Sequence, residues 1–256
     1  MNRPDNESTA QEEVRRQFGE NAAAYAYARV ESVDRLIELV SPQADWQILD
    51  VATGAGQTAV AFAPFVKRVT ATDITPQMLE QAEKLREQRC LENVALETAD
   101  AMDLPYPDNS FNLVTCRIAP HHFPDITRFV TESARVLLPA GLLAVVDNIV
   151  PPGPVGDYVN GFEKLRDPSH RRCLSLEKWL EIFAAAGLDV EQQETLAKRR
   201  DFDVWAQRHD AHTQAYLRAL LTEAGPGPSI FLKPEEEDGS LSFRLLEGII
   251  VGRKAT

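Results

Sequence analysis

Two glycines and an aspartate mark a candidate nucleotide-binding site in the first half of the chain. Gly54 and Gly56 follow a short apolar run at residues 48–52, and Asp73 ends the second predicted strand. Glycine permits a tight turn and a close approach of the backbone to a ligand, because it carries no Cβ. A carboxylate at the end of a second strand can accept hydrogen bonds from vicinal ribose hydroxyls. The spacing therefore predicts an adenosine-containing cofactor.

The glycine loop by itself leaves the cofactor open. Gly54-x-Gly56-x-x-Ala59 also fits the dinucleotide fingerprint, so an NAD(P)-dependent oxidoreductase is an alternative. Asp50 precedes the loop, where its charge would repel a pyrophosphate but suits a cationic amino-acid group. Asp100 follows the third predicted strand and could accept a hydrogen bond from an adenine amino group. A third alternative is a protein that binds the cofactor without catalysing a transfer.

Strands and helices alternate from Trp46 onward, and this alternation would place the candidate residues at one edge of a sheet. The pattern predicts strands over residues 48–52, 68–72, 93–97, 111–116, 142–148, 188–197 and 242–252. It predicts helices over residues 125–138, 156–165, 175–186 and 203–224, and a further helix that begins at Pro76 with Thr75 as its hydroxyl cap. The fold expected is α/β, a Rossmann-like doubly wound, seven-stranded and mostly parallel sheet with helices on both faces. Ligands of such sheets bind at the carboxyl ends of the strands.

The segment from Ile48 to Gly56, together with Asp73, Asp100 and residues 104–112, resembles the class I S-adenosylmethionine-dependent methyltransferases. Within that class, the chain is similar to the small-molecule group named for the ubiquinone/menaquinone biosynthesis C-methyltransferases (methyltransferase type 11). The resemblance extends from about Phe18 to Ala186. It implies S-adenosyl-L-methionine as cofactor, S-adenosyl-L-homocysteine as product and a small-molecule acceptor.

The resemblance also implies a role for each matching residue. Gly54 and Gly56 would face the methionine moiety, Asp73 would hold the ribose, and Ile74 and Met78 would flank the adenine. The other cofactor-binding residues that it implies are Asp50, Ala52, Thr53, Asp100, Ala101, Met102, Arg117 and Ile118, with Tyr25 and Arg29 in an N-terminal helical lid. Many relatives have glycine and then cysteine or serine at positions 52 and 53, so we expect no contact that depends on the side chain at position 53.

Two adjacent histidines are the candidates for acid–base chemistry at the acceptor. His121 and His122 lie between the fourth strand and the next helix, and an imidazole titrates near neutral pH. Adjacent helical residues point about 100° apart, so we expect at most one of the two to face the pocket, preferably His122. The alternative is that both only pack at the start of the helix. No third ligand at a suitable spacing accompanies them, so no metal site is expected.

Charged residues in the second half of the chain suggest what the acceptor carries. Arg166, His170 and Arg171 form a cluster that suits an anionic or carbonyl-bearing acceptor, or else a solvated face. His209 and His212 lie on the predicted helix over residues 203–224, and we expect both at the surface. Without a composition shift, the chain is expected to form one domain. Its expected parts are a tail (1–12), the lid (13–41), a cofactor-binding core (46–150) and substrate-side helices with closing strands (151–256).

Composition excludes several other classes of function. The 256 residues include 27 Lys+Arg and 39 Asp+Glu, and this acidic balance argues against nucleic acid or an anionic membrane as partner. The sequence contains no run of 18 apolar residues, so no membrane span is expected. The first residues are polar and do not resemble a secretory signal. The three cysteines are odd in number and widely spaced, so neither disulfides nor zinc are indicated, and a cytoplasmic location is expected. The sequence does not indicate an oligomeric state.

Overall fold

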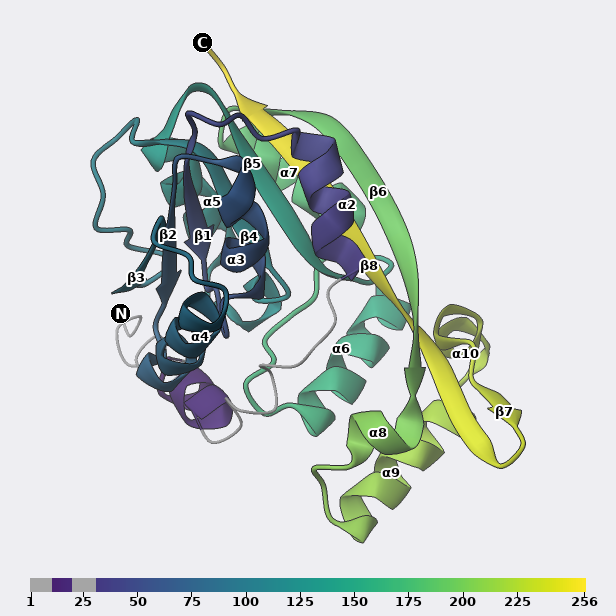
Figure 1. Ribbon diagram of the computed structural model, residues 1–256. Coiled ribbons are helices and arrows are strands. Elements are labelled where there is room, and N and C mark those ends of the chain that lie inside the picture. The colour runs from purple at the N-terminus through teal and green to yellow at the C-terminus, as the bar shows by residue number, and fades with distance from the viewer. Residues whose placement is uncertain (1–10, 20–30) are drawn as a thin grey trace, which may run out of the picture.

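Five parallel strands form the first half of the sheet. The computed structural model describes residues 11–19 and 31–256 (Figure 1). The strands are β1 (Gln47–Val51), β2 (Arg68–Asp73), β3 (Val94–Thr98), β4 (Phe111–Arg117) and β5 (Leu137–Ile149), in the spatial order β3-β2-β1-β4-β5. Residues 142–147 of β5 are all buried, which explains why this strand reads as a continuous apolar run.

Two long strands complete the sheet on the other side of β5. Strand β8 (Ser240–Lys254) lies between β5 and β6 (Leu188–Asp201) and runs antiparallel to both. The short β7 (Glu235–Glu237) pairs with β8, so the order is β3-β2-β1-β4-β5-β8-β6, with β7 as an eighth strand. The predicted Rossmann-like, mostly parallel sheet is therefore confirmed, and β7 is an addition to the seven predicted strands.

Helices cover both faces of the sheet, each over its own apolar core. One face carries α2 (Glu31–Val40), α3 (Gln57–Phe62) and α4 (Pro76–Gln88), while α5 (Ile126–Val136) and α7 (Leu176–Ala185) cover the other (Figure 1). Leu36 of α2 is fully buried in the first core, and Trp179 of α7 in the second. The second half of the segment expected as a lid thus packs on the sheet. The helix over residues 11–19 lies beside the cavity described below.

A third apolar cluster stands beyond the carboxyl ends of the parallel strands. There β6 and β8 extend past the sheet and carry α6 (Pro154–Arg166), α8 (Phe202–Ala206), α9 (Ala211–Thr222) and α10 (Pro226–Leu232) (Figure 1). Phe162 stacks on Trp205 with ring centroids 4.8 Å apart, and Phe243 packs edge-on against both rings. Of these elements, α6, α8, β6 and β8 form one wall of the cavity described below. No helix in the described ranges is long and apolar enough to cross a membrane.

Three local predictions were wrong. The hydroxyl of Thr75 makes no hydrogen bond to the first turn of α4, and its carbonyl oxygen accepts the Met78 amide at 3.0 Å instead. The helix expected to reach residue 138 ends at Val136, where β5 begins, because the chain enters the sheet before Pro139. The helix expected over 203–224 is interrupted after α8, and Asp210 then caps α9 by accepting the Thr213 amide at 2.8 Å.

Candidate functional site

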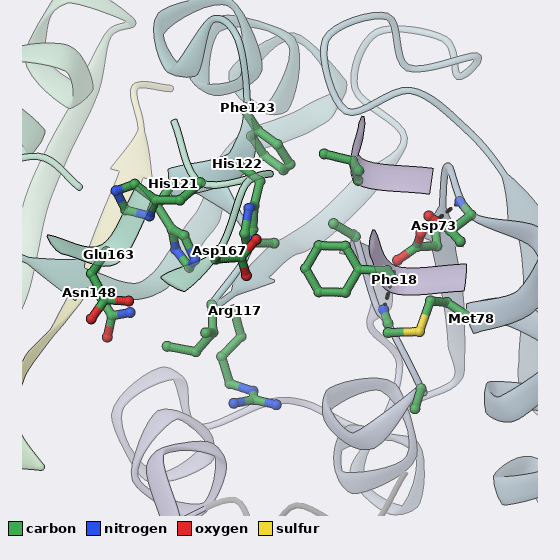
Figure 2. Close-up of a pocket in the computed structure, with 18 of the residues that line it drawn as sticks. Phe18, Asp73, Met78, Arg117, His121, His122, Phe123, Asn148, Glu163 and Asp167 are labelled. Atoms are coloured by element: carbon green, nitrogen blue, oxygen red, sulfur yellow. Dashed lines mark hydrogen bonds between the residues drawn. The ribbon is translucent and has the colours of Figure 1, made fainter. Parts of the chain in front are cut away.

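A cavity of about 960 Å³ opens at the carboxyl ends of the parallel strands. Its walls come from the loops after β1, β2, β3 and β4, from the helix over residues 11–19, and from α6, α8, β6 and β8. Figure 2 shows Asp73 at one end, His122 in the middle, and Glu163 with Asn148 at the other end. The cavity therefore extends from the end of β2 to the region where β5 and α6 lie.

The glycine loop after β1 and the carboxylate at the end of β2 are joined directly. The Gly54 amide donates to Oδ2 of Asp73 at 2.9 Å, and the Thr75 amide donates to Oδ1 at 2.8 Å. Burial raises the pKa of Asp73, although these amides favour its ionised form. Ala52 and Gly54 both have positive φ, 52° and 58°, so the backbone turns sharply where it borders the cavity. Asp73 thus orders the turn and lines the cavity as well.

Asp50 and Gly56, both predicted to bind the cofactor, lie outside the cavity lining. Asp50 is 1% exposed and accepts hydrogen bonds from Thr53 Oγ1 at 2.6 Å and Thr115 Oγ1 at 2.7 Å. Burial raises its pKa to about 6. Gly56 has φ 86°, and a Cβ there would lie 2.9 Å from the Cβ of Ala82. Both residues shape the loop from beneath.

The end of the cavity that contains Asp73 is partly covered by the helix over residues 11–19. Asp100 accepts the Met102 amide at 3.0 Å and, through its other oxygen, the side-chain amide of Gln11 at 2.6 Å. Arg15 of the same helix donates to the Ile74 carbonyl oxygen at 3.2 Å. Gln11 therefore occupies the acceptor expected for an adenine amino group. The other predicted residues that line the cavity are Thr53, Ile74, Met78, Ala101, Met102, Arg117 and Ile118. Tyr25 and Arg29 lie outside the described residues.

His121 and His122 both line the cavity, so the expectation that at most one would do so is wrong. They belong to η2 (Pro120–His122), a three-residue 3-10 turn separate from α5, and the helical spacing does not apply. Each is 6% exposed, and their ring centroids lie 4.1 Å apart. Phe18 packs edge-on against His122 at 4.9 Å and lies between that ring and Asp73 (Figure 2).

A chain of hydrogen bonds fixes which nitrogen of His122 carries a proton. Ser169 Oγ donates to Oδ1 of Asp167 at 2.6 Å and lies 3.2 Å from Nδ1 of His122. Burial alone would raise the pKa of Asp167, but His122, Ser169 and Arg208 outweigh it and hold that pKa below its usual range. Since the single Ser169 proton goes to this carboxylate, the hydroxyl can only accept from His122, whose Nδ1 must carry hydrogen. Nε2 is then left with its lone pair.

His121 has a different partner, in the sheet beneath it. Its Nδ1 lies 2.5 Å from Oδ1 of Asp147, which is 1% exposed near the end of β5. Burial raises the pKa of Asp147 to about 7 and lowers the pKa of His121 to about 4. Burial and the neighbouring His121 lower the pKa of His122 to about 3. Burial therefore favours the uncharged form of both imidazoles.

The cations expected to bind an anionic acceptor have partners within the chain. Arg166 lies 4.0 Å from Asp167, and Arg171 lies 3.7 Å from Glu13. His170 is 2% exposed and pairs through Nε2 with Asn160 at 2.9 Å. The expectation for His209 was wrong: the residue is half-buried, with Nε2 2.7 Å from the Arg166 carbonyl oxygen. His212 is exposed.

Several lining residues were not found from the sequence. Glu163 of α6 and Asp167 come from a region without a recognisable motif, and so does Ser169, which does not line the cavity but contacts His122 and Asp167. Glu247 is different, because a single carboxylate inside the apolar strand β8 is itself a signal of a buried polar role. In the described part of the chain, no group of three or more His, Cys, Asp or Glu side chains could hold a metal ion.

The fold and the site together define the class of protein. A sheet with one antiparallel strand between β5 and β6, and a glycine loop tied to the carboxylate of β2, is the class I methyltransferase fold. The methyltransferase domain family matches residues 49–145. The chain belongs to the methyltransferase family, as its relatives show.

Three relatives illustrate how far this likeness extends. The uncharacterized methyltransferase YcgJ of Bacillus subtilis is 37% identical over 196 residues, which cover 75% of this chain and 78% of the relative. The 27-O-demethylrifamycin SV methyltransferase of Amycolatopsis mediterranei is 31% identical over 71% of this chain and 68% of its own length. The crystal structure of a methyltransferase from Bacillus halodurans is 35% identical, with a TM-score of 0.84 over 88% of this chain and 99% of that one.

Proposed function

We propose that this protein transfers a methyl group from S-adenosyl-L-methionine to a nucleophilic atom of a small molecule. When bound, the cofactor supplies the methyl group; the acceptor's lone pair forms the new bond while the bond to sulfur breaks, leaving S-adenosyl-L-homocysteine. The observation that carries the proposal is the Asp73 carboxylate, held by the amides of Gly54 and Thr75 at the cavity wall. The name of the Amycolatopsis relative, a methyltransferase of a small molecule, supports the acceptor class.

The cofactor half of the cavity suits the donor's charges. Each Asp73 oxygen accepts one amide and keeps a lone pair for a ribose hydroxyl. Asp100 can accept from an adenine amino group once Gln11 withdraws. Apolar contacts with the adenine come from Ile74, Met78, Ala101 and Met102. The carboxylates on this side complement a ligand that carries an ammonium and a sulfonium.

His122 is the residue that we propose takes the acceptor's proton. Its Nδ1 carries hydrogen because Ser169 is committed to Asp167, so Nε2 has the lone pair that a general base needs. The low pKa of His122, caused mainly by burial, keeps this nitrogen unprotonated at neutral pH. A weak base suffices, since a hydroxyl becomes strongly acidic as its oxygen gains a methyl group. Ser169 and Asp167 act as positioning residues.

Titration calorimetry with S-adenosyl-L-homocysteine tests the cofactor assignment. We expect saturable binding and no heat from NAD at the same concentration. Absence of binding at millimolar ligand would refute the proposal, and preference for NAD would favour the oxidoreductase alternative. Transfer itself is measured with methyl-labelled cofactor and a panel of small hydroxylated molecules.

The role of Ser169 has a test that needs no acceptor. Nitrogen NMR of histidine-labelled protein reports which ring nitrogen of His122 carries hydrogen. We expect the Nδ1–H form in the natural protein and a mixture of both forms in Ser169→Ala. An unchanged His122 spectrum in that variant would show that Ser169 does not fix the ring.

A further inference from the structure

Three oxygen atoms at the far end of the cavity accept hydrogen bonds only and are not satisfied within the described chain. They are Oε1 of Glu163, Oε2 of Glu247 and Oδ1 of Asn148, and no hydrogen bond reaches them from any residue that the structure describes. Glu163 is 6% and Glu247 4% exposed, yet all three residues line the cavity. Buried polar atoms are nearly always paired, so a ligand is the partner that this arrangement lacks.

The three side chains converge because of the sheet register. Asn148 of β5 lies directly opposite Glu247 of β8, so their side chains emerge on the same face of the sheet. Glu163 projects from α6 into the same region, and Figure 2 shows it together with Asn148, on the opposite side of His122 from Asp73. The group therefore faces whatever lies beyond the methyl-transfer point.

The charge of this region is already balanced. Arg200 lies 3.3 Å from Oε1 of Glu247, and Arg117 is attracted to the same carboxylate. Arg166 and Arg200 act on Glu163 in the same way, although burial prevails and raises its pKa. An ammonium entering here would meet the guanidinium groups, and a carboxylate or phosphate would meet the two glutamates. The unmet requirement is for uncharged hydrogen-bond donors.

We propose that the far end of the cavity is a subsite for a neutral diol or polyol part of the acceptor. Its hydroxyl groups donate to Glu163, Glu247 and Asn148, while the reacting atom lies toward His122. The inference rests on the proposed function, since it assigns this half of the cavity to the acceptor. It replaces the anionic acceptor suggested by the sequence with an uncharged, hydroxylated one.

Crystals grown with S-adenosyl-L-homocysteine and soaked with four probes of one ring size test the subsite. The probes are cis-cyclohexane-1,2-diol, cyclohexylamine, cyclohexanecarboxylate and cyclohexanone, at equal concentration. We expect the diol alone, with its oxygens within about 3.2 Å of at least two of the three acceptor atoms. Another probe at this place, or none of the four, overturns the inference. If S-adenosyl-L-homocysteine does not bind, the proposed function is refuted separately. The two outcomes can be distinguished because the diol and S-adenosyl-L-homocysteine each have their own electron density.

Conservative variants provide a second measurement in solution. Glu163→Gln and Glu247→Gln keep the shape but exchange a carboxylate oxygen for a donating NH₂ group, so we expect diol affinity by NMR titration to fall at least fivefold. Glu236→Gln is the matched control, on the exposed strand β7, and should leave the affinity unchanged. If both Glu163→Gln and Glu247→Gln bind the diol as tightly as the natural protein does, the inference is overturned. Thermal unfolding verifies that each variant folds, and the crystal soak tests the natural chain irrespective of the variants.

Discussion

Replacing Asp73 by alanine should weaken cofactor binding more than any single substitution in the neighbouring glycine loop. Its two oxygens each accept one backbone amide and each keep a lone pair for one ribose hydroxyl. Hydrogen bonds to a charged group contribute about 1.5–3 kcal/mol each and are not additive for neighbours, so we expect a total loss of about 2–3 kcal/mol. The dissociation constant of S-adenosyl-L-homocysteine should then rise roughly 30- to 150-fold.

Titration calorimetry measures this change, with Asp103→Ala as control. Asp103 is exposed and lies outside the cavity lining, so its variant should bind within about twofold of the natural protein. A 2′-deoxy analogue of the ligand completes a double-mutant cycle: it should bind more weakly to the natural protein but lose little further affinity in Asp73→Ala. Less than threefold weakening by Asp73→Ala, with circular dichroism unchanged, would refute the ribose contact.

Three further predictions concern the loop, the N-terminal helix and the buried acid of β5. Gly56→Ala should lower the free energy of unfolding by about 2–4 kcal/mol, since its Cβ would lie 2.9 Å from Cβ of Ala82 at positive φ. Gly161→Ala, with open space around it in α6, should raise that free energy by about 0.5–1 kcal/mol; urea unfolding of both variants decides, and equal effects would contradict the steric argument. Gln11→Ala should tighten S-adenosyl-L-homocysteine binding about two- to tenfold by freeing Asp100, and unchanged affinity in calorimetry would exclude this competition. Asp147 has its pKa raised by burial from 3.8 to about 7, so its protonated form stabilises the fold at low pH and this contribution is lost as pH rises through 7. The stability of the natural protein relative to Asp147→Asn should therefore fall from about pH 4 to about pH 7 and stay level above that, and a pH-independent difference in urea unfolding would contradict this.

The fold was predictable where burial on both faces leaves a clear pattern in the sequence. Strands β1, β4 and β5 contain apolar runs bounded by polar residues or turns, and β2 and β3 alternate with helices at the same pitch, so the type and order of these elements followed without a structure. The predicted boundaries of helices and strands were wrong where a contact with a distant part of the chain overrode the local preference. Leu137 joins β5 because it pairs with Phe111 of β4, and α8 is separated from α9 where Trp205 packs into the third apolar cluster.

The candidate site was predictable in the half around Asp73 and not in the half around Glu163 and Glu247. Gly54, Asp73 and Asp100 follow consecutive strands, so their positions depend on local order in the chain. Glu163 and Glu247 meet because β8 inserts beside β5, an event that no short pattern records. His121 pairs directly with Asp147, and His122 reaches Asp167 through Ser169. These partners come from distant segments, so the tautomers and pKa values of the two histidines required the coordinates.

The separate apolar cluster on the extended ends of β6 and β8 has an evolutionary consequence. Phe162, Trp205 and Phe243 anchor α6 and α8 without contributing to either core of the sheet faces. Substitutions in this third cluster can change the cavity wall formed by α6 and α8 while the glycine loop and Asp73 stay unchanged. Related proteins can therefore differ in the small molecule that they accept while they keep the reaction that we propose.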